Sequence, residues 1–73
     1  MRVQAVRRIA VLVNGAQTET GAASLGELLV QLGFEHDQVA TALNGDFVPR
    51  QARDDTRLAA DDKVEIVAPR QGG

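Results

Sequence analysis

An apolar extended segment, an Asn-Gly pair and a polar segment predict a hairpin near the start of the chain. In Ile9–Val13 apolar side chains fall on both faces, as expected for a central strand that is covered on one side. Asn14-Gly15 comes next and favours a type I′ turn, which needs two residues at positive φ. Residues 17–20 are then the returning strand. Their polar, threonine-rich composition indicates an edge of the sheet.

One short amphipathic helix is predicted to begin at Ser24. Ser24 and Glu27 have the spacing of a capping box, in which the Ser24 hydroxyl accepts from the Glu27 amide and the Glu27 carboxylate reaches back. Gly33 suits the left-handed position that ends a helix, and Phe34 can fold back as the accompanying apolar contact. Gly26 costs about 1 kcal/mol of helix propensity relative to alanine, so packing must offset it. The apolar stripe, which has to lie against a sheet, consists of Leu25, Leu28, Leu29 and Leu32.

Extended segments resume after the helix. In residues 39–43, Val39, Thr41 and Leu43 share one face, and Ala40 and Ala42 share the other. Asn44-Gly45 turns the chain again. Phe47-Val48 begins another extended piece, which Pro49 limits because proline has no N–H for a strand ladder.

The last third of the chain predicts one more strand. Residues 50–57 are either a solvated loop or a marginal helical turn, and Asp61-Asp62 makes a turn. Residues 63–68 follow as a strand in which Val64 and Ile66 alternate with Glu65 and Val67. The predicted core combines the leucine stripe with five strand residues: Val39, Thr41, Leu43, Val64 and Ile66.

This order of elements predicts an α+β fold of the β-grasp (ubiquitin-like) type. One helix crosses between a hairpin and later strands, on a mixed sheet of four to five strands. The main alternative is a ferredoxin-like split fold. That alternative needs a second helix, and residues 50–60 are too charged and unpatterned to supply a good one.

Composition narrows the function to binding or carrying. A chain of 73 residues is one domain, too small to hold a deep pocket with a supporting shell, so a self-contained enzyme is not expected. Without cysteine, and with His36 as the single histidine, it has no thiolate nucleophile and no metal site is expected. A net charge of −2 argues against nucleic-acid binding. The apolar run Ile9–Val13 is far short of a membrane span, so we expect a cytoplasmic protein.

The candidate chemistry lies at the end of the sequence, in Pro69-Arg70-Gln71-Gly72-Gly73. Glycine has no Cβ, so a Gly-Gly end can pass a narrow channel and take backbone angles that are closed to other residues. The reactive group would be the Gly73 carboxylate, which must be activated before it can donate its acyl group. A partner enzyme has to do this, because the other glycines match no phosphate-binding spacing.

Four segments carry a family resemblance that covers residues 9–73. They are Val13-Asn14-Gly15, the helix Ser-Leu-Gly-Glu-Leu-Leu at 24–29, Ala-Leu-Asn-Gly-Asp-Phe-Val-Pro-Arg at 42–50, and the closing stretch 62–73 that ends in Gly-Gly. Together they resemble the ThiS family of sulfur carriers in thiamin biosynthesis. The run Asn-Gly-x-Phe-Val-Pro-Arg with the Gly-Gly end is the most specific part.

The resemblance implies a reaction cycle run by partners. A ThiF-like adenylyltransferase would use ATP to adenylate the Gly73 carboxylate, and sulfur from a donor such as a cysteine desulfurase would convert it to a thiocarboxylate. The thiazole synthase ThiG would then take the sulfur. Gly72, Gln71 and Arg70 would thread the end into these enzymes. The chain itself, a monomer, would bind no cofactor, metal, nucleic acid or membrane.

The sequence also departs from the family pattern. Residues 1–8 precede the first strand as an extension or lead-in, so we divide the chain into 1–8, a β-grasp domain at 9–68, and a tail at 69–73. Family members often have Asp-Gly-Asp before the last strand, where this chain has Ala60-Asp61-Asp62. Asp61 must then take the glycine conformation, which aspartate tolerates better than most residues.

Partner docking is predicted on the sheet face opposite the helix. Ala40, Ala42 and Val67 would form a shallow apolar surface near the tail, although scattered exposed apolar residues are also normal for a sheet face. Arg50 and His36 are expected on the surface, and the acidic pairs Asp54-Asp55 and Asp61-Asp62 in solvated turns or loops.

Three other functions stay open at this stage. A sister carrier for molybdopterin, cysteine or tRNA thiolation would share the fold and the Gly-Gly end. A ubiquitin-like modifier would join its end to lysine through an isopeptide bond. A plain docking module would not need Gly73 at all.

Overall fold

Two Asn-Gly turns fold the chain into two hairpins. In the computed structural model, which describes residues 8–68, both asparagines and both glycines have positive φ, at 50° and 86° in the first turn and 51° and 90° in the second. The type I′ turn predicted at Asn14-Gly15 is consistent with these angles. The hairpin strands are antiparallel pairs: β1 (Ile9–Val13) with β2 (Ala16–Thr20), and β3 (Ala40–Leu43) with β4 (Asp46–Val48).

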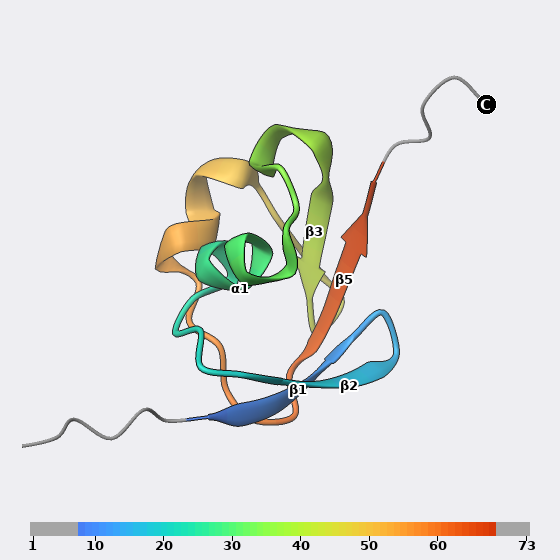
Figure 1. The fold of residues 1–73 in the computed structure, drawn as a ribbon. Helices are drawn as coiled ribbons and strands as arrows, with labels where there is room; N and C mark the ends of the chain where they lie inside the picture. The colour runs from blue at the N-terminus through green and yellow to red at the C-terminus, as the bar shows by residue number, and fades with distance from the viewer. Residues whose placement is uncertain (1–7, 69–73) are drawn as a thin grey trace, which may run out of the picture.

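The last strand, β5 (Lys63–Val67), joins the two hairpins into one sheet of order β2-β1-β5-β3-β4. It runs parallel to β1 and antiparallel to β3, so the sheet is mixed (Figure 1). The predicted α+β fold with a mixed sheet and one main helix is confirmed. The observed strands β2, β3 and β5 each lie within one residue of the predicted boundaries.

The single α-helix, α1 (Leu25–Leu32), has the predicted ends. Ser24 Oγ accepts from the Glu27 amide at 3.1 Å, and the Glu27 carboxylate accepts from the amide of Ala23 at 2.8 Å. At the other end Gly33 has a φ of 84°, and the amide of Phe34 donates to the Leu29 carbonyl at 2.9 Å. These local contacts satisfy main-chain groups that a short helix otherwise leaves unpaired.

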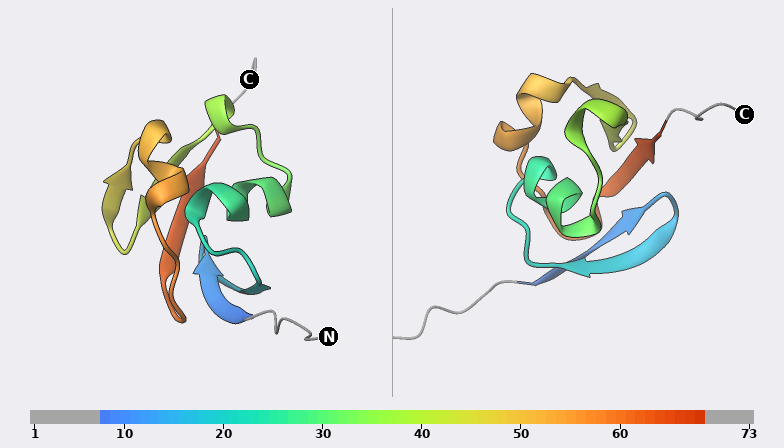
Figure 2. Two further views of the ribbon diagram at one scale, coloured as in Figure 1. Left: turned by 90° about the vertical axis from the view of Figure 1, so that its left-hand side faces the viewer. Right: turned by 45° about the horizontal axis from the view of Figure 1, so that its top comes forward.

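The core lies between α1 and one face of the sheet. Figure 2 shows, in its left-hand view, α1 and the second 3₁₀ helix η2 (Arg50–Asp55) in front of the sheet. A first 3₁₀ helix, η1 (His36–Gln38), leads from α1 into β3. The buried apolar residues come from the helix and three strands: Val11, Leu25, Leu28, Leu29, Val48, Val64 and Ile66. Thr41 is also buried, whereas three predicted core residues are half-buried against this cluster: Leu32, Val39 and Leu43.

The segment after β4 differs from the solvated loop that its charges suggested. It forms η2, so the helical alternative is right, and Arg53 within it is only 2 % exposed. The Arg53 guanidinium donates to the carbonyls of His36 and Val39, each at 2.7 Å, and to the Thr41 hydroxyl at 3.0 Å. A charge pattern cannot reveal this burial, because the acceptors come from η1 and β3.

Gly26 lies where α1 meets η2, in contact with Asp54. Gly26 is buried, and a Cβ built on it would overlap the Asp54 carboxylate. Glycine lowers the helix propensity of α1 at this position, but its lack of a Cβ lets α1 and η2 pack closely. Next to this contact, the amide of Leu25 donates to the Thr56 carbonyl at 2.8 Å and ties the start of α1 to the segment after η2.

Candidate functional site

The candidate site begins where β5 ends. β5 is the central strand of the sheet, and it carries the chain toward the predicted tail (Figure 1). The predicted reactive residue Gly73 and the predicted threading residues Gly72, Gln71 and Arg70 lie outside the described residues. The described part of the site is therefore the platform from which the tail leaves.

The outer face of the sheet, opposite α1, carries the predicted docking residues. Ala40 lies opposite Val67 in the β3–β5 register, and the next pair on the same face joins Ala42 to Glu65. Val67 is 63 % exposed, Ala40 is exposed and Ala42 is half-buried. The structure thus brings the three predicted residues together on one accessible face beside the end of β5.

Phe47 extends this face and was missed as a docking candidate. It pairs with Ala42 across the β3–β4 hairpin and is 69 % exposed. An exposed phenylalanine on a strand is a clear sequence signal, but only the register places it next to Ala42. We call Ala40, Ala42, Phe47 and Val67 together the outer apolar face.

A shallow depression adjoins the outer apolar face toward β1. Its lining includes Leu12, Lys63, Glu65 and Val67. Leu12 pairs with Lys63 in the parallel β1–β5 register, so both belong to the outer side of the sheet. Apolar contacts are therefore flanked by one cation and one anion, a mixture suited to a protein partner rather than to a polyanion.

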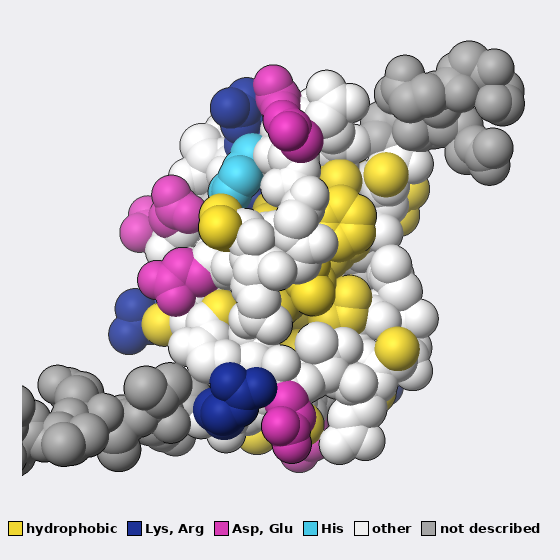
Figure 3. Space-filling model, in the orientation of Figure 1, with side chains coloured by type: hydrophobic (Ala, Val, Ile, Leu, Met, Phe, Trp, Pro, Cys, Tyr) yellow, Lys and Arg dark blue, Asp and Glu magenta, His cyan; other side chains and the backbone are white. Residues whose placement is uncertain are grey.

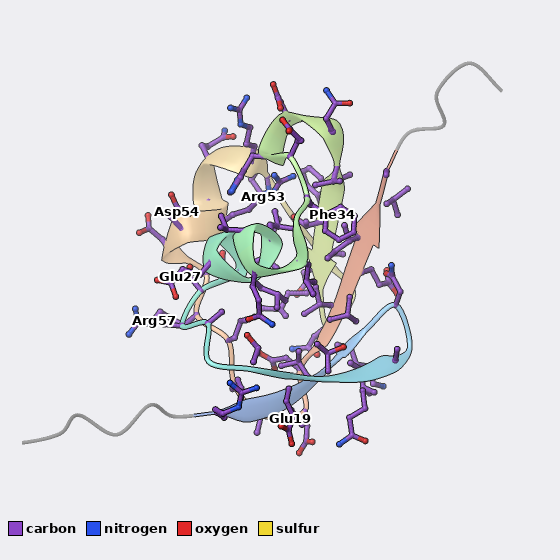
Figure 4. All side chains as sticks on the ribbon, viewed as in Figure 1. Glu19, Glu27, Phe34, Arg53, Asp54 and Arg57 are labelled. Carbon is purple, nitrogen blue, oxygen red and sulfur yellow. The ribbon has the colours of Figure 1, made fainter. Side chains whose placement is uncertain are left out.

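The side of the molecule between α1 and β5 is also apolar. Figure 3 shows yellow side chains gathered there, with the acidic and basic side chains toward the rim of that view. Figure 4 places Phe34 in this region, at the end of α1 that faces β3. Phe34 is half-buried and packs against the core, which explains its position without a binding role.

The acidic pairs have structural explanations. Asp62 accepts from the amide of Ala59 at 2.8 Å and from the Asn44 side chain at 3.0 Å, so its carboxylate closes a turn. Asp61 has a φ of 71°, the left-handed conformation predicted for it. Asp54 is exposed on η2 beside α1 (Figure 4). Over residues 8–68 no group of three or more His, Asp or Glu side chains is arranged to hold a metal ion.

His36 and Arg50 do not belong to the outer apolar face. They line an open depression with Gln51 and Asp54, and the His36 carbonyl accepts from the buried Arg53. Figure 4 labels Arg53 between η2 and β3, where its contacts are made. No helix in the part of the chain that the structure describes is long and apolar enough to cross a membrane.

Comparisons with known proteins identify the family to which the chain belongs. A ubiquitin-like sheet with one crossing helix and a platform for a terminal tail defines a class of small carrier and modifier proteins. A family model described as "ThiS family" matches residues 9–73, so the chain belongs to the ThiS family, a family of sulfur-carrier proteins. A sequence search of curated proteins finds no significant match.

Two solved structures of thiamine biosynthesis proteins from Geobacter metallireducens are similar to the chain. A crystal structure of the ThiS protein has 33 % sequence identity and a TM-score of 0.73, covering 89 % of this chain and 100 % of that one. A solution structure has 35 % identity and a TM-score of 0.74, covering 89 % of this chain and 88 % of that one. The β-grasp architecture is confirmed by these similarities.

Proposed function

We propose that the protein carries sulfur as a thiocarboxylate on Gly73 and donates it to thiazole formation in thiamin biosynthesis. The observation that carries this proposal is the family match, which spans residues 9–73 and so includes Gly72-Gly73. The similar solved structures are themselves described as thiamine biosynthesis proteins, which supports this pathway over the sister carriers.

The first chemical step belongs to a ThiF-like adenylyltransferase. A Gly73 carboxylate oxygen attacks the α-phosphate of ATP, pyrophosphate leaves, and the carboxyl group becomes an acyl adenylate. The persulfide sulfur of a donor such as a cysteine desulfurase then displaces AMP at the carbonyl carbon and forms an acyl disulfide with the donor. A thiol attacks the donor's sulfur in this disulfide and forms a new disulfide with it, and the chain leaves with a terminal thiocarboxylate that ThiG uses as its sulfur source.

The chain's own residues provide presentation rather than catalysis. Gly72 and Gly73 have no side chains to obstruct a narrow active-site channel, and Gln71 and Arg70 precede them as the threading segment. Because the sequence contains no cysteine, no thiol in the chain competes for the activated carbonyl. ATP is a substrate of the partner, and we propose that the carrier acts as a cytoplasmic monomer without a cofactor of its own.

The outer apolar face is proposed as the surface that the activating enzyme contacts. Its members Ala40, Ala42 and Val67 are adjacent, and Val67 is the last residue of β5. A partner seated on this face is therefore within reach of the chain that follows β5. The exposed ring of Phe47 adds an aromatic side chain of a kind that is enriched at protein interfaces.

Intact-mass spectrometry tests the sulfur-carrier function. The full chain is incubated with ATP, a ThiF-like enzyme and a sulfur source. The expected product is the chain with one oxygen replaced by one sulfur. A chain lacking Gly73 should show no such change, and a Gly73-deleted chain that still gains sulfur would disprove the proposal. Covalent adducts with lysines of other proteins would instead indicate a modifier.

A further inference from the structure

Asn14 has a second role besides forming the hairpin turn. The amide of Leu12 donates to the Asp62 carbonyl at 2.8 Å. Two residues further along both strands, the main-chain amide of Asn14 donates to the Val64 carbonyl at 2.8 Å. The parallel β1–β5 ladder thus advances two residues along β5 with each step. The next hydrogen-bonding position on β5 is Ile66, but the backbone of β1 turns away at Asn14-Gly15 and cannot pair with it.

The Asn14 side chain supplies that next step. Asn14 Oδ1 accepts from the Ile66 amide at 2.9 Å, and Asn14 Nδ2 donates to the Ile66 carbonyl at 3.1 Å. A carboxamide has the same carbonyl and N–H groups as a peptide unit. The side chain therefore acts as one extra peptide unit of β1 and extends the pairing of β5 toward its end.

The second Asn-Gly turn provides a comparison at the other end of the same strand. Asn44 Oδ1 accepts from the amide of Lys63 at 2.9 Å, and Asn44 has a φ of 51°, almost equal to the 50° of Asn14. The two asparagines thus brace β5 at its two ends and have nearly equal φ angles. Only the Asn14 contact lies at the end from which the tail leaves.

The position of Ile66 makes this contact relevant to the carrier function. Ile66 is followed by Val67 of the outer apolar face, and it lies seven residues before Gly73. On the other side of β5, the strand end is supported by the pairing of Val67 with Ala40, the first residue of β3. Without the Asn14 contact, the end of β5 would be held on the β3 side only, so more of its ordering would fall to the moment when a partner binds, and that ordering opposes binding.

We propose that Asn14 is a positioning residue for sulfur loading: by pairing with Ile66, its carboxamide holds the end of β5 so that Val67 and the tail reach the activating enzyme together. This inference rests on the proposed sulfur-carrier function. It predicts an effect on the encounter with the enzyme rather than on the chemistry at Gly73.

The test compares two matched variants of the full chain, Asn14→Gly and Asn44→Gly. Glycine keeps the positive φ that both turns need and removes only the carboxamide. For adenylation by the ThiF-like enzyme, Asn14→Gly should raise KM for the carrier about tenfold, the change expected when two hydrogen bonds are lost. Its kcat should stay within about twofold of the wild-type value, because docked chains present the same Gly73 carboxylate. Asn44→Gly should leave both constants within about twofold.

Amide hydrogen exchange provides a second measurement that does not depend on the enzyme. In Asn14→Gly the Ile66 amide should exchange about tenfold faster, while in Asn44→Gly the amide of Lys63 should be the one affected. Faster exchange at Ile66 with an unchanged KM would overturn the positioning role and leave Asn14 as a purely structural brace. Equal KM increases in the two variants would also overturn it.

A further variant covers the possibility that Asn14→Gly does not fold. Asn14→Asp keeps the acceptor for the Ile66 amide and loses the donor to its carbonyl, and aspartate also tolerates positive φ. It should raise KM in the same direction, and a wild-type KM would contradict the inference. Failure of the proposed function is recognised separately, because the wild-type chain would then not be adenylated at all.

Discussion

The two faces of the five-residue strand β5 have different roles: the inner face packs in the core and the outer face is exposed for a partner. Val64 and Ile66 point to the inner face, where they are buried under α1, and Glu65 and Val67 point to the outer face. Because side chains alternate along a strand, one segment can contribute to the core and to a partner surface. Substitutions at neighbouring positions of β5 are therefore expected to have different effects: those on the inner face lower stability, and those on the outer face weaken partner binding.

The largest expected effect is on the inner side. Leu28 is 0 % exposed in the middle of α1, so Leu28→Ala should lower the free energy of unfolding by about 3 kcal/mol through lost burial and the cavity left behind. That is a large part of the stability of a domain of this size. Urea unfolding followed by circular dichroism measures it, and an unchanged midpoint would contradict the assignment of the core.

A somewhat smaller loss is expected for Arg53→Lys. Lysine keeps the charge but cannot reproduce the planar fork that reaches the carbonyls of His36 and Val39 and the Thr41 hydroxyl. Leaving a buried acceptor unpaired should cost about 2 kcal/mol of unfolding free energy. The control is Arg50→Lys on the exposed surface of the same 3₁₀ helix, which should change stability by less than about 0.5 kcal/mol.

The smallest effect on stability, and the clearest effect on binding, is expected on the outer apolar face. Val67→Glu should weaken binding to the activating enzyme about tenfold, since it places an unpaired charge in an apolar contact. Val30→Glu is the matched control, because Val30 on α1 is 68 % exposed, close to the 63 % of Val67, but lies on the opposite side of the sheet. Calorimetry or surface plasmon resonance can compare the two. Equal weakening would show that the outer apolar face is not the docking surface.

Local signals predicted most of the fold. Ser24, Glu27 and Gly33 mark the ends of α1 through contacts with residues within a few positions, and the Asn-Gly turns depend only on their own backbone angles. Alternation then assigned each strand residue to a face. The placements of Ala40, Ala42 and Val67 on one face follow directly from that period of two.

The pattern of apolar, polar and charged residues did not predict contacts between segments that are remote in sequence. Arg53 was expected in a solvated segment because RQARDDTR is strongly charged, but its three acceptors lie 12 to 17 residues away along the chain. Phe47 gained its importance from its pairing with Ala42. Asn14 was interpreted as a turn residue alone, since nothing near it in the sequence shows that Ile66, 52 positions later, needs a partner.

The sequence by itself thus determined the helix, the turns and the face on which each strand residue lies, because each depends on neighbouring residues or on side-chain chemistry alone. Only the tertiary structure decided the strand order, the burial of Arg53 and the bracing of Ile66 by Asn14. These depend on segments that are remote in sequence and meet only when β5 inserts between β1 and β3.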